Sequence, residues 1–313
     1  MRIMILVTCL PLVAFADMKI TFIDARQADA TVIQIDQDSG EPFTIVVDGG
    51  DGDSDLENNI PGLMTGDSTV ELLVLSHPHK DHTGALDWLI NESGKTIQQI
   101  WWGGDAHTIQ EFTDFKDAVD AKDLVLVRPA ETTTSFAGTT DFTIRVFNNG
   151  LEFPGTAGHD FNNDSVVFQL IYEPAPSVRV TALFTGDIER DQGEMLVDEF
   201  GDELKSDIVK VPHHGSDHLF NEFPAKVAAR FAYVSSSGTH AGHRHPRKSA
   251  LDRYDATADI FCTCDAAGTF HNITVIVNEA GVISTSPSPQ PAYFVWGPNA
   301  NGIVVRSEVT PPP

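Results

Sequence analysis

An apolar run that ends directly in a histidine-rich loop is the feature that most constrains the fold of this chain. Residues 71–76 read ELLVLS, the nearly continuous apolar pattern of a strand that is buried on both faces. Residues 77–82 follow at once and read HPHKDH. In an extended loop, side chains two residues apart point the same way, so His77, His79 and Asp81 line one side. Imidazoles and carboxylates are ligands of zinc-like divalent ions, and we therefore predict a metal site at the end of a buried strand.

Histidines elsewhere in the chain are also grouped rather than scattered. Nine of the twelve fall in three short clusters: His77, His79 and His82; His213, His214 and His218; and His240, His243 and His245. Each cluster follows the end of a predicted strand, which is where open sheets place their binding sites. A further element, Thr185-Gly186-Asp187, puts a carboxylate among small residues at another strand end. Together these elements supply enough ligands for two metal ions.

Short apolar runs and helical patterns alternate along the rest of the chain. Runs rich in β-branched residues predict strands over 18–24, 30–36, 43–50, 97–104, 123–129, 142–148, 164–172, 179–187, 207–216 and 231–238, and a strand pair over 272–285. Apolar residues at helical spacing predict helices over 83–90, 189–200, 224–230 and 247–254. Strand runs in each half with helices between them predict two sheets in the middle and helices outside, an α/β sandwich.

The composition is that of a globular protein with a large excess of acid. Of the 313 residues 41% are apolar, which is ample for a core, and the formal net charge is −25 at pH 7. Such a charge repels polyphosphate at long range, so we expect no extended surface for nonspecific nucleic-acid binding. A small or short phosphorylated substrate is still compatible with it. After the N-terminus, no segment has the roughly 18 continuous apolar residues that a membrane span needs.

The first 16 residues have the three parts of a secretory signal peptide. Arg2 precedes a short apolar run, and the run ends in Ala14-Phe15-Ala16. The alternative is a buried first strand or helix. We expect cleavage before Asp17 and a secreted or periplasmic protein.

The remaining chain is expected to form one domain with a tail. No linker interrupts residues 17–285, whereas residues 286–313 are rich in proline. Cys262 and Cys264 are expected to be buried thiols, because cysteines two residues apart are too close for an easy disulfide.

Six short motifs, in order from about residue 18 to about residue 283, carry a family resemblance. They are Asp24-Ala25-Arg26-Gln27-Ala28-Asp29-Ala30, Asp48-Gly49-Gly50, Asn162-Asn163-Asp164-Ser165, Gly186-Asp187-Ile188, Val211-Pro212-His213-His214-Gly215-Ser216 and Gly242-His243-Arg244-His245-Pro246. With the HPHKDH loop, they make the chain similar to the metallo-β-lactamase-fold hydrolases. The closer resemblance is to the hydrolase domain of ComEC-type competence proteins and its free-standing relatives. The fold that this resemblance implies is a metallo-β-lactamase-like αββα sandwich.

The chain departs from the family pattern at two places. Arg26 and Ala28 stand where the family has glycines in its opening turn. Asn162 stands where members with a complete first metal site have a third histidine, and His159 lies nearby. Either residue, or water, is left as the third ligand of that site.

The resemblance implies two divalent metal ions, with zinc expected first and manganese as the alternative. The implied ligands are His77 and His79 on one ion, Asp81 and His82 on the other, Asp187 between them, and His214 closing the second site with His243 as its alternative. Asp81 and Asp187 are thereby also catalytic residues, and a hydroxide bridging the two ions is the implied nucleophile. For His213 and His243, donation of a proton to the leaving group and a supporting hydrogen bond are both open.

The resemblance favours an exported hydrolase of phosphodiester bonds. Two alternatives stay open: a noncatalytic binding module stabilised by metal, and a β-lactam or ester hydrolase on the same fold.

Overall fold

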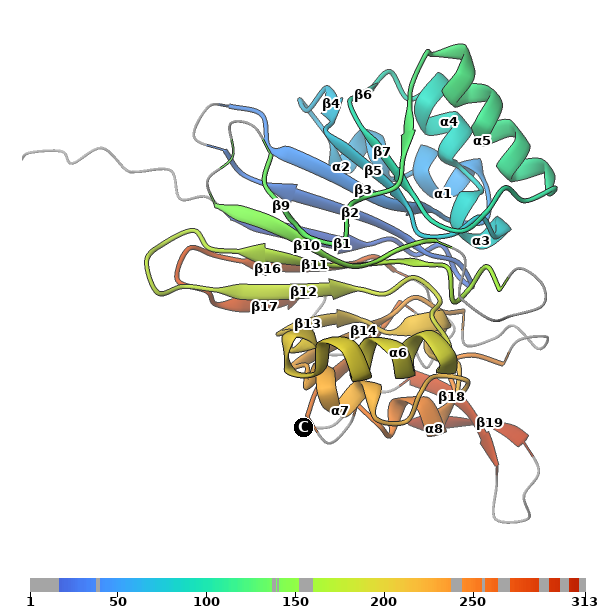
Figure 1. The fold of residues 1–313 in the computed structure, drawn as a ribbon, viewed down its shortest axis with the longest axis vertical. Helices are drawn as coiled ribbons and strands as arrows, with labels where there is room; N and C mark the ends of the chain where they lie inside the picture. The colour runs from blue at the N-terminus through green and yellow to red at the C-terminus, as the bar shows by residue number, and fades with distance from the viewer. Residues whose placement is uncertain are drawn as a thin grey trace, which may run out of the picture.

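Two stacked sheets with helices on both outer faces form the body of the protein (Figure 1). The computed structural model describes residues 17–37, 40–136, 139, 141–151, 160–237, 244–254, 257–263, 271–286, 293–298 and 304–309. All statements about the structure concern these residues.

The first sheet is built mostly from the N-terminal half of the chain. Its strand order is β17-β16-β1-β2-β3-β5-β7-β8. The strands are β1 (Met18–Phe22), β2 (Ala30–Ile35), β3 (Phe43–Gly49), β5 (Leu72–Leu75), β7 (Ile100–Trp102), β8 (Leu126–Val127), β16 (Ile273–Val277) and β17 (Ile283–Ser286). Neighbours from β17 to β3 are antiparallel, and neighbours from β3 to β8 are parallel.

The second sheet comes from the C-terminal half and has the same mixed character. Its order is β15-β14-β13-β12-β11-β10-β9. The strands are β9 (Thr133–Thr134), β10 (Phe142–Asn149), β11 (Val166–Tyr172), β12 (Val180–Phe184), β13 (Ile208–Lys210), β14 (Phe231–Val234) and β15 (Asp259–Cys262). Strands β12 to β15 are parallel and β9 to β12 are antiparallel. A separate short pair joins β4 (Thr69–Val70) to β6 (Thr96–Ile97).

Three apolar clusters hold the four layers together. The largest lies between the sheets, where Leu72 and Val74 of β5 meet residues such as Phe168 of β11. Alternate residues of β5, Leu73 and Leu75, face the opposite way and pack under the helices of the first layer. Those helices are α1 (Asp53–Glu57), α2 (Ile60–Leu63), α3 (Lys80–Thr83), α4 (Leu86–Asn91) and α5 (Gln110–Ala121).

The outer face of the second sheet is covered by α6 (Arg190–Phe200), α7 (Phe223–Val227) and α8 (Lys248–Leu251). The order of layers is therefore helices, sheet, sheet, helices, and the αββα sandwich is confirmed.

Most predicted elements are present, but several details differ. The helix expected over 83–90 is two helices, α3 and α4, separated at Gly84, where a Cβ atom would lie 2.4 Å from the backbone of Asp51. The strand expected over 207–216 stops at Lys210, because a proline at 212 and two left-handed residues cannot continue it. Helix α5 and strand β15 were not predicted.

Two of the predictions concern the ends of the chain. The signal-peptide prediction falls on residues 1–16, which lie outside the described residues. Within the expected tail, β18 (Tyr293–Pro298) pairs antiparallel with β19 (Val304–Val309). Of the helices that the structure describes, none is long and apolar enough to cross a bilayer. The expectation of a free thiol at Cys262 is wrong, because this cysteine is disulfide-bonded.

Candidate metal centre

Strand ends from both sheets converge at one end of the sandwich. The HPHKDH loop follows β5, Asp187 follows β12, and His213 and His214 follow β13. Strands β12 and β13 are parallel neighbours in the second sheet, so their carboxyl ends lie on the same side. The contact between His82 and Asp187 at 3.3 Å brings the loop after β5 of the first sheet to the same place. The structure thereby brings together three of the four sequence elements, and the fourth, at residues 240–245, is described only from residue 244 on.

The backbone around the centre is held in conformations that most side chains avoid. Asp48, His213 and His214 have φ angles of 58°, 48° and 52°, in the left-handed region. Such residues cost about 1–3 kcal/mol each and persist where the surroundings impose them, often at functional sites. Gly186, with φ at 52°, lies so close to Ser165 that a Cβ atom would be 2.6 Å from its side chain. The chain therefore needs a glycine next to Asp187.

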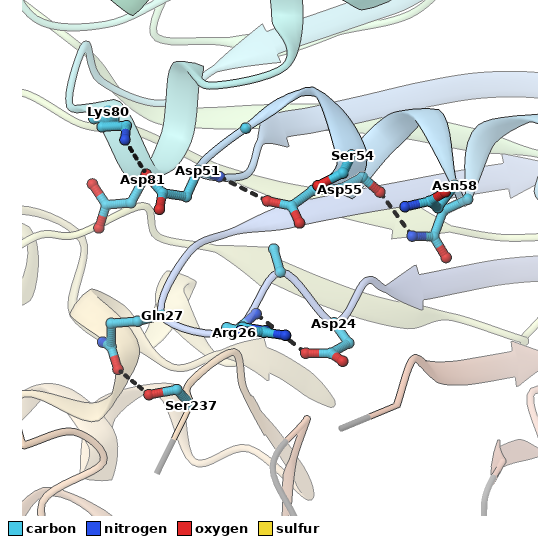
Figure 2. Close-up of a pocket in the computed structure, with 13 residues that line it drawn as sticks. Asp24, Arg26, Gln27, Asp51, Ser54, Asp55, Asn58, Lys80, Asp81 and Ser237 are labelled. Atoms are coloured by element: carbon cyan, nitrogen blue, oxygen red, sulfur yellow. Dashed lines mark hydrogen bonds and ion pairs between the residues drawn. The ribbon is translucent and has the colours of Figure 1, made fainter. Parts of the chain in front are cut away.

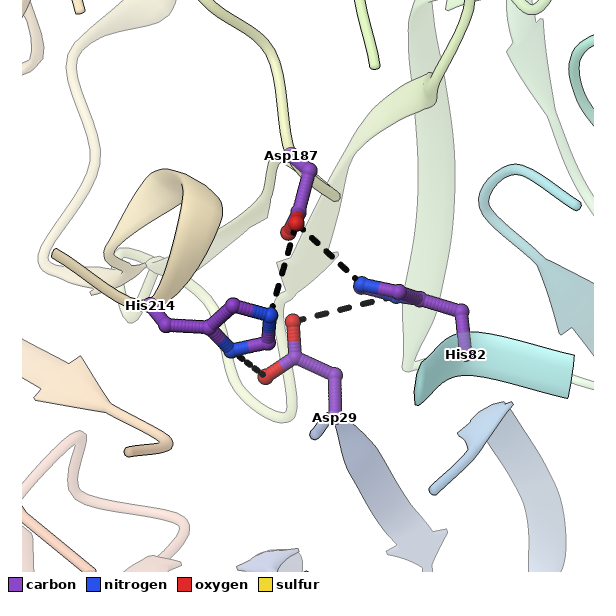
Figure 3. Close-up of side chains that lie close together, drawn as sticks. All are labelled: Asp29, His82, Asp187 and His214. Atoms are coloured by element: carbon purple, nitrogen blue, oxygen red, sulfur yellow. Dashed lines mark ion pairs between the residues drawn. The ribbon is translucent and has the colours of Figure 1, made fainter. Parts of the chain in front are cut away.

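Four buried side chains form the centre of the site: Asp29, His82, Asp187 and His214 (Figure 3). One ligand atom from each lies within 4.8 Å of the others. Oδ2 of Asp187 is 3.3 Å from Nε2 of His82 and 3.4 Å from Nε2 of His214. Oδ2 of Asp81 is 3.2 Å from the same nitrogen of His214. The arrangement includes three of the predicted ligands, and Asp81 adjoins it.

Each of the two imidazoles is fixed by a hydrogen bond at its other nitrogen. Nδ1 of His82 lies 2.9 Å from Oδ2 of Asp48, and Nδ1 of His214 lies 3.0 Å from the carbonyl oxygen of Ser235. Supports of this kind set the ring orientation of metal-binding histidines. They leave both Nε2 atoms directed at Asp187.

His77 and His79 form a second group beside the first. Nε2 of His77 is 3.0 Å from Nδ1 of His79, and the His77 ring is centred 4.1 Å from the ring of His82. Nδ1 of His77 is 3.1 Å from Oγ of Ser76 and 3.4 Å from Oγ of Ser165. The two predicted ligands of the first ion therefore lie together.

The contacts do not single out a third ligand for the ion expected at His77 and His79. Asn162 donates through Nδ2 to Oε1 of Glu189 over 3.1 Å, while its Oδ1 is buried without a hydrogen-bond partner. His159, the alternative, lies outside the described residues. The ring of His107 is centred 5.9 Å from that of His79, and nothing in the sequence pattern pointed to it.

The two groups have opposite protonation tendencies. Burial lowers the pKa of His77 well below its usual value and also lowers that of His79. Burial acts the same way on His82 and His214, but the charge of Asp187 and of neighbouring carboxylates outweighs it. The pKa of His82 is raised well above its usual value, and that of His214 is raised to about 10.

The pKa values of the acidic partners, Asp187 and Asp81, are lowered. Burial works to raise the pKa of Asp187, but His82 and His214 hold it well below its usual value. For Asp81 the hydrogen bond from His214 likewise outweighs burial, and its pKa is lowered. Metal ligands must be deprotonated, so both carboxylates are ready to bind a cation, whereas His82 and His214 must first release a proton.

The predicted proton donors lie at the rim. Nε2 of His213 is 3.9 Å from Oδ2 of Asp187, and its Nδ1 is 3.1 Å from Oε1 of Glu189. Its side chain is 20% exposed, so His213 faces both the centre and solvent. His243 falls outside the described residues. Its neighbour His245 is described, and its ring is centred 5.4 Å from that of His213.

Four residues of the site had no assigned role in the sequence analysis. They are Asp29, Asp48, Glu189 and Lys210. Asp29 and Asp48 stood in motifs of the family resemblance and, like Asp187, lie at the ends of strands, which was the available signal. Lys210 was visible as a lysine inside an apolar strand. Glu189 had no signal, because an acidic residue before a helix is common.

A large open pocket adjoins the centre at Asp81 (Figure 2). Its volume is about 1040 Å³. One wall carries Asp51, Asp55 and Lys80, and the opposite wall carries Asp24 and Arg26. Lys80 is paired with Asp51 at 3.2 Å. Asp81 is 34% exposed, so the pocket provides a route from solvent to the centre.

The residues present fit a divalent cation. Nε2 of His82 is buried and makes no hydrogen bond. Buried polar atoms without hydrogen bonds are unusual in proteins and are explained where an ion binds. The donor set is imidazole nitrogen and carboxylate oxygen, which suits zinc and manganese.

Comparisons with known proteins found similar solved structures at low identity. No model of a known protein family matches the chain, and no curated protein matches it. Solved structures similar to it include the isothiocyanate hydrolase from Delia radicum gut bacteria, at 14% identity over 81% of this chain and 100% of that one, with a TM-score of 0.45. A metallo-β-lactamase from Pontibacter korlensis aligns at 14% identity over 75% of this chain and 79% of its own, with a TM-score of 0.30. TMB-1 aligns at 12% identity over 67% and 91%, with a TM-score of 0.37.

The architecture does not rest on these likenesses. The layers and strand order of the chain itself give the metallo-β-lactamase-like αββα sandwich, with a buried His/Asp group that fits a metal ion.

Proposed function

We propose that this protein is an exported, binuclear metal-dependent hydrolase of phosphodiester bonds. The observation that carries the proposal is the convergence of His82, Asp187 and His214 beside Asp81, at the inner end of an open pocket. A purely structural metal site is usually closed on all sides by protein ligands. This centre instead has a side that a substrate can reach.

Each part of the centre has a role in the proposed chemistry. His82, His214, Asp81 and Asp187 would hold one ion, and His77 and His79 would hold the other with Asp187 between them. When bound, two divalent ions supply a Lewis acid and a water of lowered pKa.

His213 is suited to give a proton to the leaving oxygen. Its Nδ1 contacts Glu189 at 3.1 Å, which orients the ring and leaves Nε2 on the side of Asp187.

The preference for phosphodiesters rests on two motifs that resemble the ComEC-type domain. These motifs, Asn162 to Ser165 and Val211 to Ser216, both contact the segment around Asp187. Its backbone N–H donates to Oγ of Ser165 over 3.1 Å, and the N–H of His213 donates to the carbonyl oxygen of Gly186 over 3.3 Å. The N–H of Glu189 donates to Oδ1 of Asn163 over 2.9 Å. Both motifs therefore fix the backbone on either side of the Asp187 carboxylate.

The pocket supports a small or short substrate. Among the described residues that line it, Asp24, Asp51, Asp55 and Asp81 outnumber the cations Arg26 and Lys80. A polyanion would be repelled along such a wall, whereas a single phosphodiester reaching the metal ions would not need a long binding surface.

Export is proposed on the N-terminal sequence and is compatible with the disulfide at Cys262, since disulfides persist in oxidising compartments. N-terminal sequencing of protein recovered outside the cytoplasm tests it. We expect a mature chain that starts at Asp17, and a chain that keeps Met1 would contradict export.

A substrate panel on metal-loaded protein tests the activity. The panel contains bis-p-nitrophenyl phosphate, a dinucleotide, an ester and a chromogenic β-lactam, each with zinc or manganese. We expect turnover of the phosphodiesters, lost after chelation and restored by metal. Turnover of the lactam or ester alone would replace the proposal with the corresponding hydrolase. Metal binding without any turnover would favour a noncatalytic binding module.

A further inference from the structure

The metal centre contains a buried cation of its own, Lys210. This residue ends β13, whose Ile208 faces the core between the sheets and whose Val209 faces the helices. Alternation along the strand places Lys210 on the same side as Ile208. Its side chain is only 5% exposed. A lysine is almost never buried to this degree unless it is paired.

The partners of Lys210 are residues of the centre. Its ammonium group forms an ion pair with Oδ2 of Asp29. It also donates to the carbonyl oxygen of Gly186 over 3.1 Å and lies 3.5 Å from Oδ1 of Asp187. Asp29 is itself 5% exposed, so this pair is enclosed by protein.

Two carboxylates approach the two histidines from opposite edges of the rings (Figure 3). Oδ2 of Asp187 lies 3.3 Å and 3.4 Å from the Nε2 atoms of His82 and His214. Asp29 lies on the Nδ1 side, 3.9 Å from His82 and 3.7 Å from His214. Both Nδ1 atoms are already held, by Asp48 and by the carbonyl of Ser235.

An imidazole binds a metal through one nitrogen while the other nitrogen is supported by a hydrogen bond. The ion therefore belongs on the Nε2 side, with Asp187. Asp29 lies on the Nδ1 side of both rings, so it is not placed to bind the same ion.

We propose that Asp29 is the counter-ion of Lys210 and not a metal ligand, and that the pair positions Asp187. Lys210 holds Oδ1 of Asp187, which leaves Oδ2 directed at the two Nε2 atoms. Both are positioning residues, because they act through Asp187. The inference rests on the metal centre of the proposed hydrolase and is independent of its substrate.

The two roles of Asp29 make opposite predictions for a double mutant. Removing one partner of a buried ion pair leaves an uncompensated charge, whereas replacing both with neutral groups of similar size is often tolerated. Asp29→Asn leaves a free ammonium group that competes with the metal for Asp187. Adding Lys210→Met removes that competitor. If Asp29 were a ligand, the second substitution would restore nothing.

The experiment is a double-mutant cycle on the full chain with two readouts. Zinc affinity is measured by competition with a chromophoric chelator, and urea unfolding is followed on the metal-free protein. Changes behind metal ligands commonly cost about 10–100-fold in affinity. We expect Asp29→Asn to weaken zinc binding about a hundredfold and Lys210→Met about tenfold.

The double mutant should recover at least about tenfold relative to Asp29→Asn. In the metal-free state it should also unfold at a higher urea concentration than either single mutant. Lys205→Met, at an exposed lysine 3.1 Å from Asp202, is the matched control and should change neither readout.

Three results would overturn the inference or separate it from the proposed function. A double mutant that binds zinc no better than Asp29→Asn shows that Asp29 is a ligand. If Asp29→Asn does not fold, a folded double mutant with zinc affinity within about tenfold of wild type supports the pair, and a folded one that binds zinc more weakly than this overturns it. If wild type binds no zinc or manganese, the proposed hydrolase fails, and the absence of coupling in the urea cycle would then reject the pair as well.

Discussion

The two histidine groups of the centre each contain a fully buried histidine but differ in their surroundings. His77 and His79 come from one loop, contact each other over 3.0 Å, and have lowered pKa values. His82 and His214 come from different sheets, share Oδ2 of Asp187, and have raised pKa values. The His77 and His82 side chains are both fully buried, so burial alone does not explain the contrast. The carboxylates around the second pair do.

This difference indicates which ion binds more tightly. In the metal-free protein, protons on His82 and His214 take the place of a cation among Asp48, Asp81 and Asp187. The same carboxylates then stabilise a metal ion once the protons leave. His77 and His79 need no proton release but have fewer fixed partners. We therefore expect a strong site at His82 and His214 and a weaker one at His77 and His79.

The largest expected effect comes from removing the carboxylate that the two groups share. Asp187→Ala should lower kcat/KM on a phosphodiester by at least about a hundredfold, because no neutral side chain can hold two cations. Circular dichroism should show that the fold is largely retained. Asp191→Ala, at an exposed position of α6, is the control. Wild-type rates in Asp187→Ala on both activated and natural phosphodiesters would rule out a binuclear hydrolase.

Metal content separates the two groups directly. At saturation we expect about two ions per chain, and brief chelation should remove the His77/His79 ion first. His77→Ala should therefore retain about one ion per chain, whereas His82→Ala should retain less than one. Metal analysis after gel filtration measures this. Equal retention in the two variants would mean that the groups do not differ in affinity.

The contrast also shows what the sequence can and cannot predict about the centre. The HPHKDH loop, Asp187 and His214 were found because each follows an apolar run, and strand ends of parallel sheets meet at one edge. The αββα layers followed from the alternation of strand and helix patterns. These signals are local, and they were sufficient for the fold and for most of the candidate ligands.

What the sequence did not reveal depends on contacts between distant segments. Asp29 and Lys210 are 181 positions apart by their numbers, and only the stacking of the two sheets brings them together. Glu189 gains its role from Asn162 and His213, which come from other loops. Helix α5 was overlooked because its apolar face is narrow and interrupted by charges. Pair partners in the interior cannot be deduced from spacing along one chain.

A smaller effect is expected at the rim, where His213 contacts Glu189. His213→Ala should lower the rate on a natural phosphodiester less than Asp187→Ala does, by about a hundredfold if His213 donates the proton, which is the low end of the roughly 10² to 10⁴-fold that general acid catalysis contributes. On a nitrophenyl phosphodiester the loss should be much smaller, because nitrophenolate leaves without a proton. Glu189→Gln should show the same pattern to a lesser degree. Equal losses on both substrates would indicate a supporting role instead.

The smallest and most diagnostic effect is the pH dependence of the metal-free protein. A group whose pKa is lowered on folding takes up a proton more readily when unfolded, so His77 and His79 should destabilise the fold as pH falls below about 6.5. His82 and His214 have raised pKa values. Their contribution is complete below pH 6.5 and is lost as pH rises toward the folded value, about 10 for His214.

Stability without metal should therefore peak near pH 6.5, with each single histidine changing the unfolding free energy by at most about 1.4 kcal/mol per pH unit on its own limb. Urea unfolding in chelator at pH 5, 6.5 and 9 measures both limbs. His77→Ala should flatten the acid limb and leave the alkaline limb, and His214→Gln should do the reverse.

Because zinc must displace the protons on His82 and His214, its affinity for that site should rise between pH 6.5 and 9, while binding at His77 and His79 should change little. If both variants alter the same limb, the two histidine groups are not in opposite charge states and the order of metal binding derived from them is wrong.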